Sequence, residues 1–195
     1  MWNERYANED FAYGTEPNAF LKENAGLLIG PVLSLAEGEG RNAVFMASLG
    51  LDVLGVDGSD VGLAKAHKLA AARGVTIRTA VADLTTYAPP ENSFGSVVSI
   101  WAHLPIEIRR QLHRRVERCL KPGGIVLLEA YSKAQINRDT GGPMKLDALM
   151  SRADLEQEFS ECDPIISREI DREVVEGTFH TGMASVVQFV ARKRA

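Results

Sequence analysis

Short apolar runs alternate with helix-forming segments along this chain, and this alternation limits its fold more than any other feature. The runs are rich in Val, Ile and Leu and are bounded by glycine or proline, which is typical of buried strands. The segments between them carry apolar residues at helical spacing. The pattern predicts strands over 32–36, 52–56, 75–81, 96–101 and 125–128, and helices over 43–49, 60–73, 106–120 and 153–159.

Two further strands are predicted near the end of the chain, over 165–174 and 184–191. No helix separates them, only a glycine-containing turn at Glu176-Gly177. Strands joined through helices pair in parallel, whereas strands joined by a turn pair antiparallel. We therefore predict a doubly wound, mostly parallel α/β sheet with helices on both faces and an antiparallel C-terminal hairpin at one edge.

The composition sets limits on the partners of this chain. Its 195 residues are 45% hydrophobic and 25% charged, as in an average globular protein, so one domain over 1–195 is expected. The chain has 22 Lys and Arg and 26 Asp and Glu, so its net charge is 22 − 26 = −4. It therefore lacks the positive field that nucleic-acid binding needs. No segment is apolar enough for a signal peptide or a membrane span, so we expect a cytoplasmic protein without membrane contact. Cys119 and Cys162 have no metal-ligand spacing, and we expect no metal.

Three loops that follow predicted strands are the candidate ligand site. In open α/β sheets the ligand lies beyond the carboxyl ends of the strands. The first loop contains Gly38 and Gly40, which let the backbone approach a ligand closely. The second strand ends at Asp57, whose carboxylate can accept two hydrogen bonds from ribose hydroxyls. The third ends before Asp83, which can accept a hydrogen bond from the exocyclic amine of a purine, so the loops predict an adenosine site.

Two adenosine-containing cofactors fit this pattern. Gly38-x-Gly40-x-x-Ala43 satisfies the dinucleotide fingerprint G-x-G-x-x-G/A, which favours NAD(P) and a reductase. However, Glu37 and Glu39 place two carboxylates where a pyrophosphate would lie. S-adenosylmethionine has no phosphate and carries positive charge, so this charge pattern favours the methyl donor.

The run LAEGEGRNAVFMASLGLDVLGVDGSDVGLAKA, the later VAD and the KPGG turn resemble class I S-adenosylmethionine-dependent methyltransferases. Within that class the chain is similar to the small tellurite-resistance (TehB-like) group. The resemblance implies a seven-stranded sheet and an N-terminal lid within residues 1–28. It also implies cofactor-binding roles for Glu37, Gly38, Gly40 and Asn42 around the methionine part, Asp57 at the ribose, Gly58 and Ser59 at the adenosine edge, Asp83 and Leu84 at the adenine, Trp101 and His103 near the methyl group, and Arg5, Tyr6 and Tyr13 in the lid.

The acceptor side is less determined by the sequence. His180 resembles a histidine that the tellurite group places near its substrate, although Thr181 departs from the arginine of some relatives. Glu129 and Tyr131, after the fifth predicted strand, are further catalytic candidates. A soft acceptor (a thiolate, selenium or tellurium species) needs no general base, whereas an oxygen or nitrogen acceptor needs one, and the sequence does not choose between these classes.

We therefore expect methyl transfer from S-adenosylmethionine to a small molecule, by a monomer or weak homodimer. An NAD(P)-dependent reductase and a non-catalytic S-adenosylmethionine-binding module remain alternatives. Two side-chain environments are also predicted: His67 and His113 at the surface of charged helices, and Cys119 as an inert core thiol.

Overall fold

A seven-stranded sheet organises the molecule in the computed structural model, which describes residues 2–138, 140–177 and 180–195. The strand order is β3-β2-β1-β4-β5-β7-β6. The strands are β1 (Val32–Leu35), β2 (Val53–Asp57), β3 (Arg78–Val81), β4 (Phe94–Ile100), β5 (Leu120–Tyr131), β6 (Cys162–Glu176) and β7 (His180–Lys193). Strands β1 to β5 pair in parallel, and β7 pairs antiparallel with both β5 and β6. The predicted fold class, with its antiparallel edge hairpin, is confirmed.

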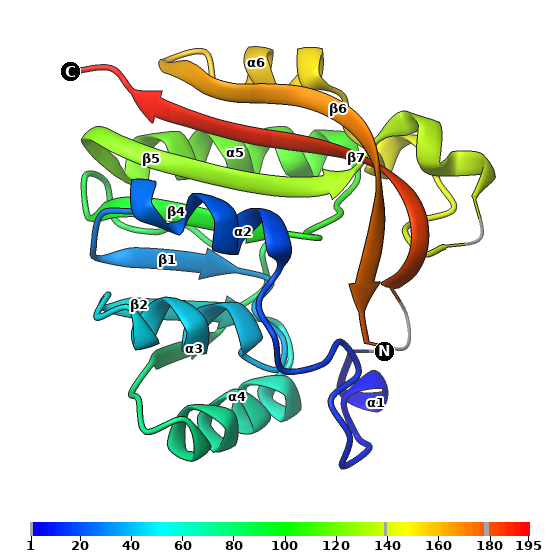
Figure 1. Cartoon of the computed structure of the whole chain (residues 1–195). Coiled ribbons are helices and arrows are strands. Elements are labelled where there is room, and N and C mark those ends of the chain that lie inside the picture. The colour runs from blue at the N-terminus through cyan, green and yellow to red at the C-terminus, as the bar shows by residue number, and fades with distance from the viewer. Residues whose placement is uncertain (1, 139, 178–179) are drawn as a thin grey trace.

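Helices cover both faces of this sheet (Figure 1). The helices are α1 (Trp2–Arg5), α2 (Ala19–Asn24), α3 (Arg41–Ser48), α4 (Asp60–Ala72), α5 (Ile106–Cys119) and α6 (Arg152–Glu158), with short 3-10 turns η1 (Ala25–Leu27), η2 (Lys133–Asn137) and η3 (Leu146–Ala148). Apolar residues of α2, α3 and α4 pack on one face, and those of α5 and α6 pack on the other. The core is therefore two apolar layers that enclose the sheet.

Element boundaries differ from the sequence-based prediction where pairing, rather than composition, decides them. The third strand begins at Arg78 instead of residue 75, because β2 offers it partners only from Leu54 onward. The fifth strand already begins at Leu120, opposite Phe94. The KPGG segment interrupts the regular pairing of β5 with β4, which resumes at Ile125.

The β6–β7 hairpin is longer than predicted and extends beyond the rest of the sheet. Pairing of β7 with β5 ends at Val186 opposite Tyr131, while β6 and β7 remain paired as far as Glu176 and His180. We call this extension, residues 171–176 and 180–185, the hairpin arm. It bends toward the N-terminal segment in Figure 1. The arm therefore covers the carboxyl ends of the parallel strands, where the sequence predicts the ligand site.

Candidate functional site

A cavity of about 700 Å³ lies at the carboxyl ends of β1 to β4, beneath the N-terminal segment (residues 2–14) and the tip of the hairpin arm. Its volume is in the range of small-molecule sites. The lining residues are Trp2, Arg5, Tyr6, Tyr13, Gly14, Ala36, Glu37, Gly38, Glu39, Arg41, Asn42, Asp57, Gly58, Val81, Ala82, Asp83, Leu84, Ile100, Trp101, Ala102, His103, Leu104, Gly142, Pro143 and His180. Of the seventeen site residues named from the sequence, all line this cavity except Gly40, Ser59, Glu129 and Tyr131.

The two glycines of the first loop have different surroundings. Gly38 lines the cavity, and its backbone N–H donates to Asp57 Oδ2 at 2.9 Å. A Cβ on Gly38 would lie 2.7 Å from the Tyr6 hydroxyl oxygen, so the loop and the N-terminal segment touch at this point. Gly40 faces α4 instead, because a Cβ there would lie 2.4 Å from the Cβ of Ala66. Gly38 therefore faces the ligand site, whereas Gly40 permits the close packing of α3 on α4.

The two glutamates of this loop are occupied by protein partners. Glu37 accepts hydrogen bonds from the Ser34 hydroxyl and from the Ala43 N–H, and burial raises its pKa to about 7. Glu39 forms an ion pair with Lys65 and accepts the Ala12 N–H at 2.8 Å. Both carboxylates therefore repel a pyrophosphate less than the sequence suggested, and the acidity of the crevice depends mainly on Asp57.

Asp57 ends β2 and is buried beside the cavity. Its Oδ2 accepts the Gly38 N–H and its Oδ1 accepts the Ser59 N–H at 2.8 Å, while burial raises the pKa of the carboxyl. Each carboxylate oxygen has a second lone pair, so a diol can still donate to it. Gly58 lines the cavity, whereas the Ser59 hydroxyl caps α4 by accepting the Gly62 N–H.

The third strand ends at the outer rim of the same half. Asp83 is exposed, and its hydrogen bonds with Thr85 lower the pKa of its carboxyl. Leu84 and the backbone from Val81 complete this rim. An exposed acid beside apolar side chains can hold the edge and the face of a planar purine.

The other half of the cavity begins at the end of β4. Trp101 follows this strand with a left-handed backbone (φ 58°), as Ala36 does after β1 (φ 51°). Such strain in non-glycine residues is typical of functional sites. His103 has both ring nitrogens engaged, one with the Trp101 carbonyl at 3.0 Å and the other with the Tyr131 N–H at 2.9 Å. Since Nε2 accepts from that N–H, Nδ1 carries the proton, and burial lowers the pKa of the ring to about 3. His103 is therefore a neutral wall residue.

The three catalytic candidates lie at different depths. The His180 ring lines the cavity and contacts the rings of Tyr13, Trp101 and Tyr131 at centroid distances of 4.8, 5.2 and 5.4 Å. Burial lowers the pKa of His180 to about 4, and its enclosed Nδ1 has no hydrogen-bond partner among the described residues. Tyr131 lies behind Trp101, and its hydroxyl donates to the Thr140 carbonyl at 3.3 Å. Glu129 is fully buried and is bound by protein groups. The structure therefore brings only His180 of the three to the cavity.

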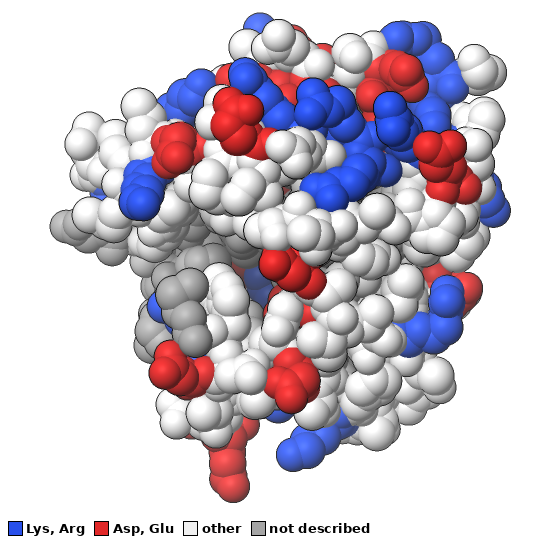
Figure 2. Space-filling view, turned by 180° about the vertical axis from the view of Figure 1, so that it is seen from behind, with Lys and Arg blue, Asp and Glu red and all other residues white. Residues whose placement is uncertain are grey.

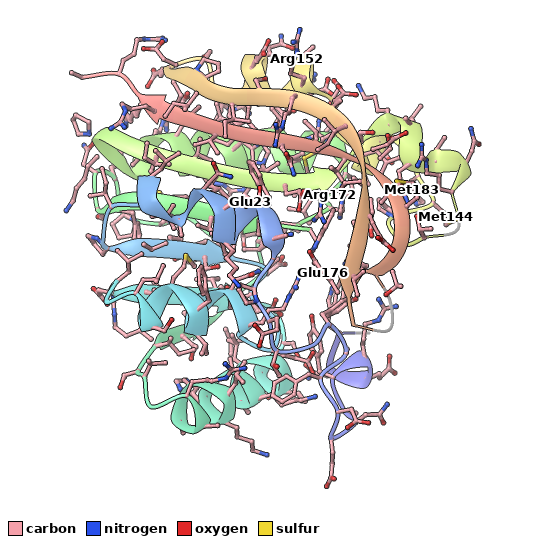
Figure 3. All side chains as sticks on the ribbon, viewed as in Figure 1. Glu23, Met144, Arg152, Arg172, Glu176 and Met183 are labelled. Carbon is pink, nitrogen blue, oxygen red and sulfur yellow. The ribbon has the colours of Figure 1, made fainter. Side chains whose placement is uncertain are left out.

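A buried polar network that the sequence analysis missed connects the hairpin arm to the cavity wall. Glu176 accepts hydrogen bonds from the Trp101 indole N–H at 2.6 Å and the Asn18 amide at 2.7 Å, and it forms an ion pair with Arg41. Arg172 bridges Glu176 and Glu129. Arg172 and Glu176 extend from β6 toward the core in Figure 3. Gln188 donates to Glu129 at 2.7 Å and completes the network.

The N-terminal segment is held over the cavity by several contacts. Lys65 of α4 donates to the Asn8 and Asp10 carbonyls at 2.9 and 2.7 Å. Arg5 donates to the Tyr13 hydroxyl at 2.9 Å, and burial raises the pKa of Tyr6, which lines the cavity. The N-terminal segment lies where the resemblance implied a lid.

Charges elsewhere are mixed. Figure 2 shows Lys and Arg gathered on the upper part of the face covered by α5 and α6, with Asp and Glu among them. Within residues 2–138, 140–177 and 180–195, no group of three or more His, Cys, Asp or Glu is arranged to hold a metal ion. In the same part of the chain, every helix is too short or too polar to cross a bilayer.

Comparison with known proteins identifies the central part of the chain. Residues 32–124, which include β1 to β4 and the nucleotide half of the cavity, match the family model described as a methyltransferase domain. These residues resemble a methyltransferase domain. This match confirms the resemblance to class I S-adenosylmethionine-dependent methyltransferases that the glycine loop, VAD and KPGG indicated.

One curated relative and two solved structures are similar to this chain. The 2-heptyl-1-hydroxyquinolin-4(1H)-one methyltransferase of Mycobacteroides abscessus is 27% identical over 121 residues, which cover 60% of this chain and 53% of that enzyme. The chain thus matches about half the length of this relative. TehB from Haemophilus influenzae has the same fold, with a TM-score of 0.76 and 19% identity over 99% of this chain and 66% of TehB. A protein solved in work on the conversion of a disulfide bond into a thioacetal group during echinomycin biosynthesis also shares it, with a TM-score of 0.79 and 20% identity over 98% of this chain and 88% of that one.

Proposed function

We propose that this protein transfers a methyl group from S-adenosylmethionine to a small-molecule acceptor. The observation that carries the proposal is a single cavity whose two halves meet at β1 and β4. One half presents Asp57 and Asp83 at successive strand ends, which suits an adenosine, and the other presents the aromatic residues and His180. The residues present fit a cationic, phosphate-free nucleoside, because Asp57 retains free lone pairs and the crevice is acidic.

Bound S-adenosylmethionine supplies an activated methyl group on a sulfonium. The chain contributes position and shielding: Asp57 holds the ribose hydroxyls, the rim at Asp83 and Leu84 holds the adenine, and the N-terminal segment excludes water. Fixing two reactants in line in this way can remove about 7–11 kcal/mol from a barrier. No covalent intermediate on the protein is needed.

The acceptor class follows from the other half. A thiolate or another soft nucleophile, one of the two classes that the sequence leaves open, would need no base. An oxygen or nitrogen acceptor would pass its proton to His180, because this neutral ring lines the cavity. The similarity to an enzyme named for methylating a hydroxyquinolone supports a small organic acceptor.

The cofactor assignment is tested by calorimetry with S-adenosylhomocysteine and NADH. We expect binding of the first and none of the second. Asp57→Ala removes charged hydrogen bonds and should weaken S-adenosylhomocysteine binding by about 1.5–3 kcal/mol. The matched control is Asp52→Ala, an exposed acid just before the opposite end of the same strand, paired with Arg78, which should leave the affinity unchanged. Tight NADH binding, or an unchanged affinity in folded Asp57→Ala, would refute the assignment.

A turnover assay separates an enzyme from a non-catalytic binding module. The assay measures S-adenosylhomocysteine release with a panel of aromatic thiols, selenite, small amines and aromatic hydroxyl compounds. Methylation of any member supports catalysis, and His180→Ala should then reduce turnover of oxygen acceptors far more than of thiols. Cofactor binding without turnover across the panel would favour the binding module.

A further inference from the structure

The strand order divides the cavity into two halves with different electrostatic character. The ends of β1, β2 and β3 form the acidic nucleotide half around Asp57 and Asp83. The acceptor half lies beyond β4 and is lined by Ile100, Leu104, Pro143, Trp101, His103 and His180. None of these six side chains carries a permanent charge, so any charge in the acceptor half must come from the segments that cover it.

Two of the described lining residues are cations: Arg5, which donates to the Tyr13 hydroxyl, and Arg41 of α3, which Glu176 neutralises. The Glu176 carboxylate forms a buried ion pair with Arg41 and also accepts the indole N–H of Trp101. Both members of the ion pair are less than a tenth exposed. The second guanidinium nitrogen of Arg41 donates to the Glu16 carbonyl at 3.3 Å. Arg41 is therefore engaged in holding the cavity wall together. An anionic ligand would have to compete with Glu176 for the Arg41 guanidinium.

The histidines add hydrogen-bonding capacity without charge. Both nitrogens of His103 are engaged by backbone groups. His180 is neutral, because burial lowers its pKa, and its Nδ1 is enclosed. The Nε2 atom of His180 can therefore form a hydrogen bond with a bound molecule. A buried anion without a cationic partner is costly, whereas a neutral guest loses little on leaving water.

The walls also favour a flat guest. Trp101 is stacked with Tyr131 at 4.5 Å and with His103 at 6.3 Å, and its indole is fixed by Glu176. The ring of Tyr13 lies 4.8 Å from that of His180 across the junction of the N-terminal segment with the hairpin arm. Rigid aromatic walls favour offset stacking with planar rings.

We propose that the acceptor half binds an uncharged, planar aromatic molecule, with His180 as its hydrogen-bond partner, and that it discriminates against carboxylates and inorganic oxyanions. This inference rests on the proposed function and narrows its acceptor class. It names Glu176 as a specificity-determining residue, because Glu176 removes the positive charge of Arg41 from the acceptor wall.

The test uses two probes that differ by one carboxylate, 4-hydroxyquinoline and 4-hydroxyquinoline-2-carboxylate, with sodium selenite as the oxyanion. Each is titrated by calorimetry into protein saturated with S-adenosylhomocysteine. We expect the neutral probe to bind with a Kd at least about tenfold lower than that of the carboxylate, and selenite not to bind. Equal or tighter binding of the carboxylate or of selenite, or no binding of the neutral probe, overturns the inference. Failure of S-adenosylhomocysteine itself to bind instead rejects the proposed function, before any probe is added.

The variant Glu176→Gln tests whether Glu176 causes the preference for the neutral probe. It keeps an oxygen for the Trp101 indole but leaves Arg41 without a negative partner, so the preference for the neutral probe should shrink by about tenfold. Glu173→Gln makes the same change at an exposed position three residues earlier in β6 and should leave the preference unchanged. An unchanged preference in folded Glu176→Gln overturns the role of Glu176. If that variant does not fold, the preference of the wild-type protein alone decides the acceptor class.

Discussion

Gly40 and Gly50 share a left-handed backbone but differ in what surrounds them. Their φ angles are 92° and 85°. A Cβ on Gly40 would lie 2.4 Å from the Cβ of Ala66, whereas a Cβ on Gly50 would meet nothing within 4 Å. The pair therefore separates the cost of the backbone conformation from the cost of close packing between α3 and α4.

We expect Gly50→Ala to cost about 1–2 kcal/mol, because only the left-handed conformation is penalised. Gly40→Ala should cost roughly 2–5 kcal/mol, because overpacking adds to the same strain. Denaturant unfolding of both variants measures the difference. Equal losses of stability would show that α4 can move away from Gly40 without cost.

At the residue scale, local motifs were readable from the sequence and long-range partners were not. The glycine loop and Asp57 are adjacent to predicted strand ends, so their place at the cavity followed from the topology rule. Glu176 reaches Asn18 and Arg41 from more than a hundred residues away, and no spacing signals such contacts. His67 is exposed as predicted. The prediction for His113 was wrong: α6 packs against α5, and the His113 ring is buried on Glu158 at 2.6 Å.

At the scale of elements, the N-terminal segment depends on α4 for its position. The Lys65 ammonium binds two carbonyls of the segment and the Glu39 carboxylate, which in turn accepts the Ala12 N–H. Asn3 adds hydrogen bonds with Ser59 and Asp60 at the start of α4. The order of strands and helices was predictable from periodicity. The attachment of the N-terminal segment to α4 was not, because it depends on one buried lysine within that helix.

We expect Lys65→Met to release the segment, because two carbonyls lose their donor and Glu39 loses its cation. Amide hydrogen exchange over residues 2–14 should accelerate, and S-adenosylhomocysteine should bind about tenfold more weakly. Lys68→Met, on the exposed side of α4, is the matched control and should change neither quantity. Unchanged exchange in Lys65→Met would mean that the segment is held by its aromatic contacts instead.

For the whole molecule, buried histidines should make stability depend on pH. Burial lowers the pKa of His103 to about 3 and of His180 to about 4, and it also lowers the pKa of His113. Such groups contribute stability that is present above their unfolded pKa of about 6.5 and is lost as the pH falls toward the folded values. Glu37 acts in the opposite direction: its pKa is raised to about 7, so its contribution is present at low pH and is lost as the pH rises through 7.

The three histidines oppose the carboxyls whose pKa is raised, among which Glu37 has the large shift, so we expect the Tm to fall by about 3–8 °C between pH 7 and pH 5. Replacing Glu37 with Gln removes the opposing contribution and should make this fall steeper. Thermal unfolding monitored by circular dichroism at several pH values measures both. A Tm that is constant or rises on acidification would show that these histidines are protonated in the folded protein.

The placement of the two chain ends has a practical consequence. Trp2 borders the cavity, whereas the end of β7 lies at the opposite side of the molecule (Figure 1). An affinity tag fused ahead of α1 would therefore add chain at the cavity mouth and disturb titrations with small molecules. A tag placed after β7 leaves that mouth open, and protein immobilised through this end on a sensor surface presents the cavity to the solution.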